Sequence, residues 1–242
     1  MYRPSVPIAE GCTVNAFRSG RAVFLSVAVF TGSGALGCAR NAQRGLVIGA
    51  AGGAVLGGVI GKVSGSTAKG AIVGAVVGGA AGAIIGDQMD RQAAELKQNI
   101  PGARVERVGE GIQVTFESGL LYDFDSDVVK PQARSNLQSL AQSLDKYPGS
   151  DLLILGHTDS VGTADYNKRL SVRRADAAAE FLISQGVARS RIATGGLGEE
   201  EPIESNATAE GRSRNRRVEV AIYASKELRE KAQQEAAGKG KS

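Results

Sequence analysis

Three local signals that decide the fold lie together in the stretch Leu155-Gly-His-Thr-Asp-Ser-Val-Gly-Thr-Ala-Asp-Tyr-Asn-Lys-Arg-Leu-Ser-Val-Arg-Arg174. The apolar run Asp151–Gly156, which overlaps its start, ends in glycine and is typical of a buried strand. Polar and turn residues follow, and Thr163 can then cap a helix that runs to about Gln185, with Gly186 as its stop. The sequence therefore predicts a strand, a loop and a helix in direct succession.

One face of the predicted helix carries polar residues next to the loop. The residues at i, i+4, i+7 and i+11 on this face are Asn167, Ser171, Arg174 and Ala178. The free backbone N–H groups of the first turn and the planar fork of Arg174 favour a carboxylate, and Asp159 on the preceding loop favours an ammonium group. The pair can therefore hold a zwitterionic amino acid. Alternatively, the two side chains bridge each other on a solvated surface, where such pairs contribute about 0–1 kcal/mol.

The order and spacing of these residues resemble the OmpA-like peptidoglycan-binding domain over roughly residues 112–223, including the closing motif Asn215-Arg-Arg-Val-Glu219. The resemblance implies that Asp159 binds the ammonium and Arg174 the carboxylate of a diaminopimelate in the stem peptide of the cell wall. It further implies that a few neighbours line the pocket: Thr158, Asn167 and Leu170. Arg217 is a possible contact at the rim. Peptidoglycan is the expected partner, and no turnover is expected.

The surrounding pattern alternates strands and helices, which predicts an α/β sandwich for residues 104–224. Arg104–Val108 and Ile112–Phe116 alternate around a glycine-rich turn and are typical of a hairpin. A helix is expected from Pro131 to near Tyr147, and further strands at Arg191–Gly195 and Val218–Tyr223. Residues 225–242 are expected to form a charged tail that is helical at first.

Catalysis and nucleic-acid binding are disfavoured. His157 is the only histidine, the chain has no Gly-x-Ser-x-Gly motif, and one histidine without a second histidine or paired cysteines cannot form a typical zinc site. The basic cluster near the C-terminus is not interleaved with aromatic residues, and the net charge is only +4 over 242 residues. We therefore expect a binding protein that is not an enzyme and requires no cofactor or metal.

Residues 1–37 are typical of an export signal, with Arg18 and Arg21 before the apolar core Ala22–Phe30. The end of this segment at Cys38 resembles a lipoprotein signal, which implies lipidation of Cys38 and a lipid-anchored mature N-terminus at residues 38–44. By the same resemblance, Ala39 implies sorting to the outer membrane, with the protein on the periplasmic face. Glu10 and Cys12 are unusual in such a signal, so we expect translation to begin near Val14.

Residues 45–86 form two blocks of a glycine zipper, in which every fourth residue is a glycine. The first block runs from Gly45 to Gly61 and the second from Gly70 to Gly86, with a polar turn between them. Such grooves let helix backbones approach closely, so we expect a helical hairpin and self-association through the zippers. Each block is at the short end of what can cross a bilayer. A polar helical spacer is expected at 87–103.

Together these features predict an outer-membrane lipoprotein that attaches the envelope non-covalently to peptidoglycan. A pore or an envelope assembly factor built from the zippers, with secondary wall binding, is an alternative. A flagellar-stator subunit of the MotB type carries a similar wall-binding domain but needs a proton-carrying carboxylate in its span. The apolar blocks contain none, so this alternative is disfavoured.

Overall fold

A computed structural model of the chain describes residues 47–48, 65–123 and 125–239. Its centre is a six-stranded sheet in the order β1-β5-β4-β6-β3-β2. The strands are β1 (Val47–Ile48), β2 (Arg104–Val108), β3 (Gly111–Glu117), β4 (Ser150–His157), β5 (Ile192–Gly198) and β6 (Arg217–Ala224). Only β4 and β5 are parallel, and every other neighbouring pair is antiparallel.

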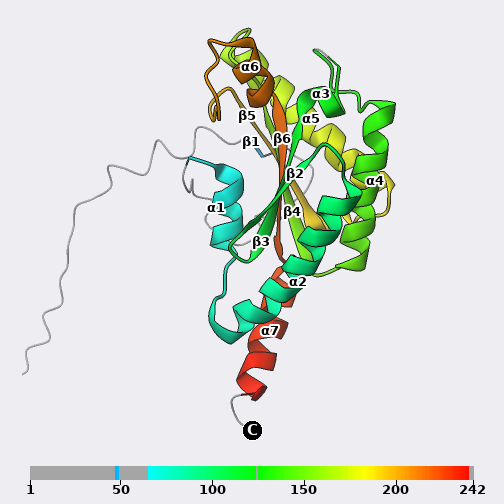
Figure 1. Ribbon diagram of the computed structural model, residues 1–242, viewed down its shortest axis with the longest axis vertical. Coiled ribbons are helices and arrows are strands. Elements are labelled where there is room, and N and C mark those ends of the chain that lie inside the picture. Colours follow the sequence, from blue (N-terminus) through cyan, green and yellow to red (C-terminus); the bar gives the residue numbers. More distant parts are fainter. Residues whose placement is uncertain (1–46, 49–64, 124, 240–242) are drawn as a thin grey trace, which may run out of the picture. The chain divides into compact units, whose positions relative to one another are not determined.

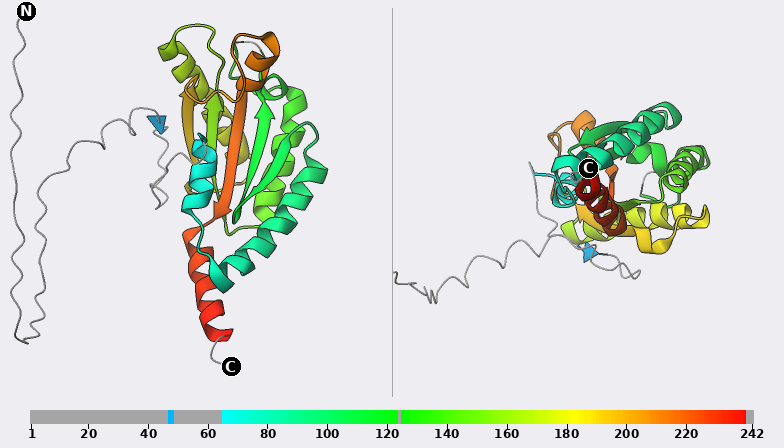
Figure 2. Two further views of the ribbon diagram at one scale, coloured as in Figure 1. Left: turned by 60° about the vertical axis from the view of Figure 1, so that its left-hand side comes forward. Right: turned by 90° about the horizontal axis from the view of Figure 1, so that it is seen from below.

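Helices cover both faces of this sheet (Figure 1). They are α1 (Thr67–Gly74), α2 (Gly79–Asn99), α3 (Ser118–Leu121), α4 (Pro131–Lys146), α5 (Ala164–Ser184), η1 (Arg189–Arg191), α6 (Ala209–Asn215) and α7 (Lys226–Lys239). Helices α2, α4 and α5 bury the larger core against one face, whereas α1 lies on the other face (Figure 2). The predicted α/β sandwich is confirmed.

The strand, loop and helix expected from the opening stretch are present. Helix α5 begins after Thr163, whose hydroxyl accepts a hydrogen bond from the backbone N–H of Tyr166 at 3.2 Å. Gly186 adopts a left-handed conformation with φ 99° just after the helix, as expected of a C-terminal stop. The predicted hairpin, the helix that starts at Pro131 and the closing strand are also confirmed.

The second zipper block differs from the single helix that its spacing predicts. Helix α1 ends at Gly74 and α2 begins at Gly79, and two successive glycines at this start have positive φ, Gly78 at 69° and Gly79 at 62°. The carboxylate of Glu110 accepts hydrogen bonds from the N–H groups of Val77 (2.9 Å) and Gly78 (2.8 Å). The block breaks because a distant glutamate satisfies the backbone that a continuous helix would have paired internally.

Both halves of this block pack onto the domain. On α1, Ala68 and Ile72 are buried in the smaller cluster, which includes Leu153, Leu155 and Tyr223 of the sheet. Helix α2 buries Met89, Ala93 and Leu96 in the larger core. Residues 87–99 are therefore part of the domain, and the expectation of a polar spacer there is wrong. In the described part of the chain, no helix has both the length and the hydropathy needed to cross a membrane.

The first zipper block lies outside the described residues, apart from Val47 and Ile48. These two residues form β1 and pair with Gly196 and Gly195 of β5. The export signal, Cys38 and the N-terminal residues up to 46 also lie outside the described residues. The charged tail forms α7, which contacts α2 and buries Ala232 in the larger core.

Candidate ligand-binding site

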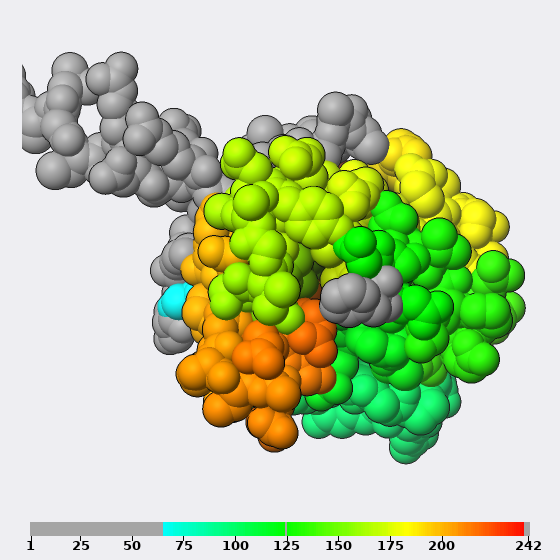
Figure 3. Space-filling view, turned by 90° about the horizontal axis from the view of Figure 1, so that it is seen from above, coloured from blue at the N-terminus to red at the C-terminus, as the bar shows by residue number. Residues whose placement is uncertain are grey.

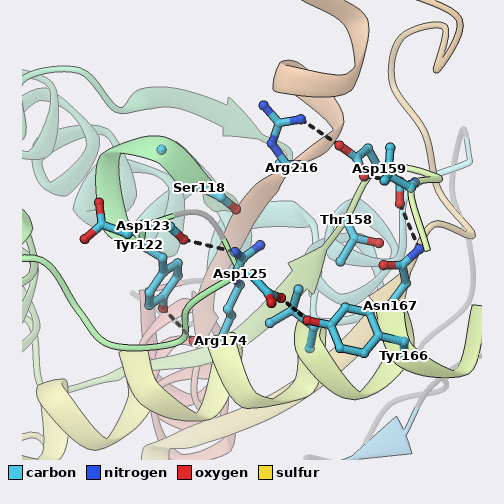
Figure 4. Close-up of a pocket in the computed structure, with 13 residues that line it drawn as sticks. Ser118, Tyr122, Asp123, Asp125, Thr158, Asp159, Tyr166, Asn167, Arg174 and Arg216 are labelled. Atoms are coloured by element: carbon cyan, nitrogen blue, oxygen red, sulfur yellow. Dashed lines mark hydrogen bonds and ion pairs between the residues drawn. The ribbon is translucent and has the colours of Figure 1, made fainter. Parts of the chain in front are cut away.

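A pocket of about 230 Å³ opens at the carboxyl end of β4. Three segments build it: the β4–α5 loop with the first half of α5, the α3 region with the chain that follows it, and the residue before β6. The lining residues are Ser118, Gly119, Tyr122, Asp123, Asp125, Thr158, Asp159, Val161, Tyr166, Asn167, Leu170, Arg174 and Arg216 (Figure 4). Figure 3 shows this end of the domain.

Close contact between α5 and the two parallel strands sets the geometry of the pocket. A Cβ added to Gly156 of β4 would overlap the carbonyl oxygen of Ser171, and one added to Gly196 of β5 would lie 2.5 Å from the Ser171 hydroxyl. The Ser171 hydroxyl accepts a hydrogen bond from the N–H of Gly198 (2.9 Å) and donates one to the carbonyl of Lys168 (2.7 Å). Glycine in the strands therefore brings the helix face directly over the strand ends.

Arg174 is a buried cation, with only 3% of its surface exposed. Its Nε donates to the carbonyl of Ser126 at 2.9 Å, and its guanidinium carbon lies 5.5 Å from the centre of the Tyr122 ring. Burial lowers the pKa of the guanidinium, against the opposing effects of Tyr122 and Asp125, but an arginine stays charged in a protein. Among the described residues no carboxylate forms an ion pair with it. Burying a charge without an ion-pair partner is costly, so the site favours the binding of an anion.

Asp159 is also buried but has a charged partner. Its Oδ2 lies 2.6 Å from Nη1 of Arg216, and its Oδ1 accepts a hydrogen bond from the N–H of Val161 at 3.1 Å. Asn167 holds the loop by donating to the backbone carbonyl of Asp159 (3.2 Å). Asp159 and Arg174 therefore share one pocket without bridging each other, contrary to the surface-pair alternative.

Two buried hydroxyl groups beside these charges have no hydrogen-bond partner within the ranges that the structure describes. They are Oγ of Ser118 and Oγ1 of Thr158, and both residues line the pocket. Buried hydroxyls are usually paired, because leaving one unpaired costs about 1–3 kcal/mol. Together with Arg174, they make the pocket suited to a small polar ligand.

The structure brings five predicted residues together at the pocket: Thr158, Asp159, Asn167, Leu170 and Arg174. Arg217 does not join them. Its side chain is buried on the opposite face of the sheet, where Nε lies 2.7 Å from Glu219 and Nη2 donates to the carbonyl of Glu201 (3.1 Å). Successive strand residues face opposite sides, so Arg216 reaches the pocket instead.

Four further lining residues were not predicted as ligand contacts: Ser118, Tyr122, Tyr166 and Arg216. The only available signal was the closing motif, in which two arginines are adjacent and only one can face the ligand. His157 does not line the pocket and lies 3.9 Å from Glu219, beside Arg217. No group of three or more histidine, cysteine or acidic side chains among the described residues is placed to hold a metal ion.

Comparison with known proteins shows the family of this domain. Residues 121–216 match the model of the OmpA family. The chain is 35% identical over 130 residues to the peptidoglycan-associated lipoprotein of Mesorhizobium japonicum, which covers 54% of this chain and 77% of that protein. The chain belongs to the OmpA family.

Other relatives match this chain over a smaller part of their own length. A protein of Escherichia coli (strain K12) named "Probable lipoprotein YiaD" is 42% identical over 140 residues, which is 57% of this chain and 64% of that protein. An outer membrane porin F of Pseudomonas fluorescens is 44% identical over 111 residues, only 34% of its length. The chain thus spans less than two thirds of these first relatives. Residues 19–90 match a second family, the YMGG-like Gly-zipper.

A solved structure shares the fold of the OmpA-family domain. The cell wall anchor of the T6SS from Pseudomonas aeruginosa superposes with a TM-score of 0.50 at 31% identity, covering 56% of this chain and 96% of that one. A MotB-like protein from Desulfovibrio vulgaris gives a TM-score of 0.53 at 22% identity, with 59% and 95% covered, and shows a common fold alone.

Proposed function

We propose that the OmpA-family domain binds peptidoglycan non-covalently, by holding the diaminopimelate of a stem peptide in the pocket at the end of β4. Arg174 binds the carboxylate and Asp159 the ammonium of one amino-acid centre. The observation that carries this proposal is the buried Arg174 guanidinium, which has no acidic ion-pair partner among the described residues but lies in the same pocket as Asp159. The names of the relatives, a peptidoglycan-associated lipoprotein and a cell wall anchor, support it.

The pocket is suited to holding a zwitterion in one orientation. The planar fork of Arg174 can take a carboxylate through two parallel hydrogen bonds, which a lysine could not provide. The ammonium replaces or shares the contact that Arg216 makes with Asp159. The hydroxyls of Ser118 and Thr158 are available to further polar atoms of the ligand. No bond is made or broken, so the protein binds without turnover.

The same proposal places the domain in the cell envelope. Cys38 carries a lipid in the outer membrane, the domain lies on the periplasmic face, and the first zipper block contributes to self-association. The name of the relative from Escherichia coli, a lipoprotein, supports the anchor. A zipper-built pore or assembly factor remains the second candidate, and the match of residues 19–90 to the Gly-zipper family favours testing it. A MotB-type stator is the weaker alternative.

The test is binding of the full chain to purified sacculi and to two soluble muropeptides that differ in one residue. One carries diaminopimelate in its stem peptide, and the other carries lysine, which lacks the second carboxylate. Arg174→Ala and Asp159→Ala should each weaken binding of the diaminopimelate form by about 30-fold or more, because each leaves a ligand charge unpaired.

The matched control is Arg173→Ala. Arg173 is the neighbour of Arg174 on α5, and its Nε pairs with Asp127 at 2.9 Å on the surface, outside the pocket. It should leave binding unchanged. Wild-type affinity in both pocket variants would overturn the assignment. Conductance across a bilayer with unaltered sacculus binding would instead support the zipper-built pore.

A further inference from the structure

Tyr122 forms one wall of the pocket and contacts both the backbone carbonyl and the guanidinium of Arg174. It follows α3, its N–H donates to the carbonyl of Ser118, and its backbone forms a bridge with that of Val129. The side chain is 2% exposed and points towards α5, as Figure 4 shows. Although nothing in the sequence distinguishes it from an ordinary core aromatic residue, its contacts concentrate on one functional arginine.

The first contact fixes the backbone. The Tyr122 hydroxyl donates to the carbonyl oxygen of Arg174 at 2.6 Å. Burial raises the pKa of this hydroxyl, and the opposing effect of Arg174 does not cancel the shift, so the group remains a protonated donor at physiological pH. The hydrogen bond therefore does not depend on pH in the physiological range, and it sets the height of Arg174 over the pocket.

The second contact orients the charged guanidinium. The guanidinium lies over the Tyr122 ring, 5.5 Å from its centre, within the range of a favourable cation–π interaction. The Ser126 carbonyl takes Nε at 2.9 Å, and the Asp123 carbonyl lies 3.5 Å from Nη2. Nη1 makes no hydrogen bond within the described ranges. The ring and the loop carbonyls thus hold the plane of the guanidinium, while Nη1 and the second N–H of Nη2 can still donate to a ligand carboxylate.

A purely structural role for Tyr122 would require only its volume. Its side chain belongs to the larger core cluster, and phenylalanine would fill nearly the same space. The hydroxyl bond and the ring contact with Arg174 go beyond this, because both converge on the residue that would bind the ligand carboxylate. A role in recognition would therefore change selectivity between ligands, whereas loss of packing would weaken all ligands alike.

We propose that Tyr122 is the positioning residue for carboxylate recognition: its ring and hydroxyl set the Arg174 guanidinium in the plane that binds the stem-peptide carboxylate. The inference rests on the proposed function of the same pocket. It makes Tyr122 the residue on which the preference for diaminopimelate over lysine depends. Asp159, which would hold the ammonium common to both ligands, lies on the other side of the pocket from Tyr122 (Figure 4).

The experiment measures the affinity of the full chain for the diaminopimelate and lysine muropeptides, with Tyr122→Leu and Tyr122→Phe. Tyr122→Leu removes the ring and the hydroxyl and should weaken binding of the diaminopimelate form about tenfold. Tyr122→Phe keeps the ring and should weaken it about threefold, through loss of one hydrogen bond. Affinity for the lysine form should change less than about twofold in both variants, because this ligand lacks the carboxylate that Arg174 would bind.

Equal weakening of both ligands in Tyr122→Leu would show a packing role and overturn the proposal, as would unchanged affinity for the diaminopimelate form. If the leucine variant does not fold, Tyr122→Phe decides by the same comparison. The ¹⁵N-edited signal of the Arg174 Nε–H adds a direct readout, since the ring should shift it in the wild type and the phenylalanine variant. Failure of the proposed function is distinct: the wild type would then bind neither ligand, or both equally.

Discussion

At the scale of single residues, the two charges of the pocket are satisfied differently in the free protein. Asp159 already has Arg216 at 2.6 Å, so a ligand ammonium exchanges one cation for another. Arg174 is buried with only carbonyl oxygens and an aromatic ring around it. We therefore expect the carboxylate end of the ligand to contribute more of the net affinity than the ammonium end.

Removing the Thr158 hydroxyl should separate binding from stability. Oγ1 of Thr158 is buried without a hydrogen-bond partner among the described residues, so Thr158→Val should not lower the melting temperature. Loss of a ligand hydrogen bond should weaken muropeptide binding about two- to tenfold. Thr163→Val is the control: its hydroxyl caps α5 at 3.2 Å, so it should lower stability by about 1 kcal/mol. Calorimetry of both variants checks this.

Asp151 should make stability depend on pH. Burial raises the pKa of its carboxyl from 3.8 to about 6, although Arg191 opposes the shift. Because the folded state binds this proton more tightly than the unfolded state, the contribution of Asp151 favours folding below about pH 4 and is lost as the pH rises through 6. Asp151→Asn should therefore gain free energy of unfolding relative to the wild type between pH 4 and 7.

Denaturant unfolding at several pH values tests this, with Asp145→Asn as a control that removes an exposed aspartate. A difference between Asp151→Asn and the wild type that is the same at pH 4 and pH 7 would contradict the expected titration.

The sequence predicted the pocket residues of one loop and one helix, but not those that come from more distant segments. Asp159 and Arg174 could be found because a glycine-ended strand and a capped helix fix their relation locally. Arg216 and Arg217 could not be told apart, because β6 begins at Arg217 and its pairing with β3 determines which side chain faces the pocket. Ser118 and Tyr122 come from a distant segment, and only the folded sheet places them beside α5.

At the scale of elements, the contact of α5 with β4 and β5 depends on strand glycines. Gly156→Ala should destabilise the domain by several kcal/mol, since its Cβ would overlap the Ser171 carbonyl, a backbone atom that cannot rotate away. Gly238→Ala is the control, because no atom lies within 4 Å of its Cβ position in α7. It should be neutral or stabilising by up to about 1 kcal/mol. Chemical denaturation of both variants provides the measurement.

In the second zipper block, the β2–β3 hairpin covers part of the glycine face that the spacing predicts to pack against another helix. Gly82 lies on α2 where a Cβ would overlap the Glu110 carboxylate. The space beside this glycine is therefore filled by a side chain from the turn between β2 and β3, and not by another helix. Spacing predicts that a helix face is smooth, but it cannot tell which surface covers that face.

Glu110→Gln should loosen the link between α1 and α2. The carboxylate accepts from the N–H groups of Val77 and Gly78, and an amide offers only one acceptor oxygen in its place. Hydrogen exchange at these two amides should become faster. Glu106→Gln, in the same hairpin but in an exposed pair with Arg104, should leave both rates unchanged.

At the scale of the whole molecule, the domain begins earlier than its strands suggest. Helices α1 and α2 cover opposite faces of the sheet and bury large side chains, including Ile72, Ile85, Met89 and Leu96. Each such side chain contributes about 1.5–3 kcal/mol when buried.

A fragment of residues 65–242 should therefore unfold cooperatively at a higher temperature than a fragment of residues 104–242. The shorter fragment should also bind a hydrophobic dye, because it exposes the parts of the two sheet faces that α1 and α2 cover. Equal melting temperatures for the two would show that α1 and α2 are dispensable.

The attachment of α1 also determines how the protein would bear mechanical load. The N–H and hydroxyl of Thr67 donate to the carboxylate of Glu201 at 3.1 and 2.7 Å, and Arg217 donates to the Glu201 carbonyl beside the pocket residue Arg216. Once tension separates the two-residue edge strand β1 from β5, the chain between Cys38 and Gly65 can extend at most about 90–100 Å. Tension between a lipid at Cys38 and a bound stem peptide would enter and leave at neighbouring points of one end of the sheet. The strands below would carry little of that force.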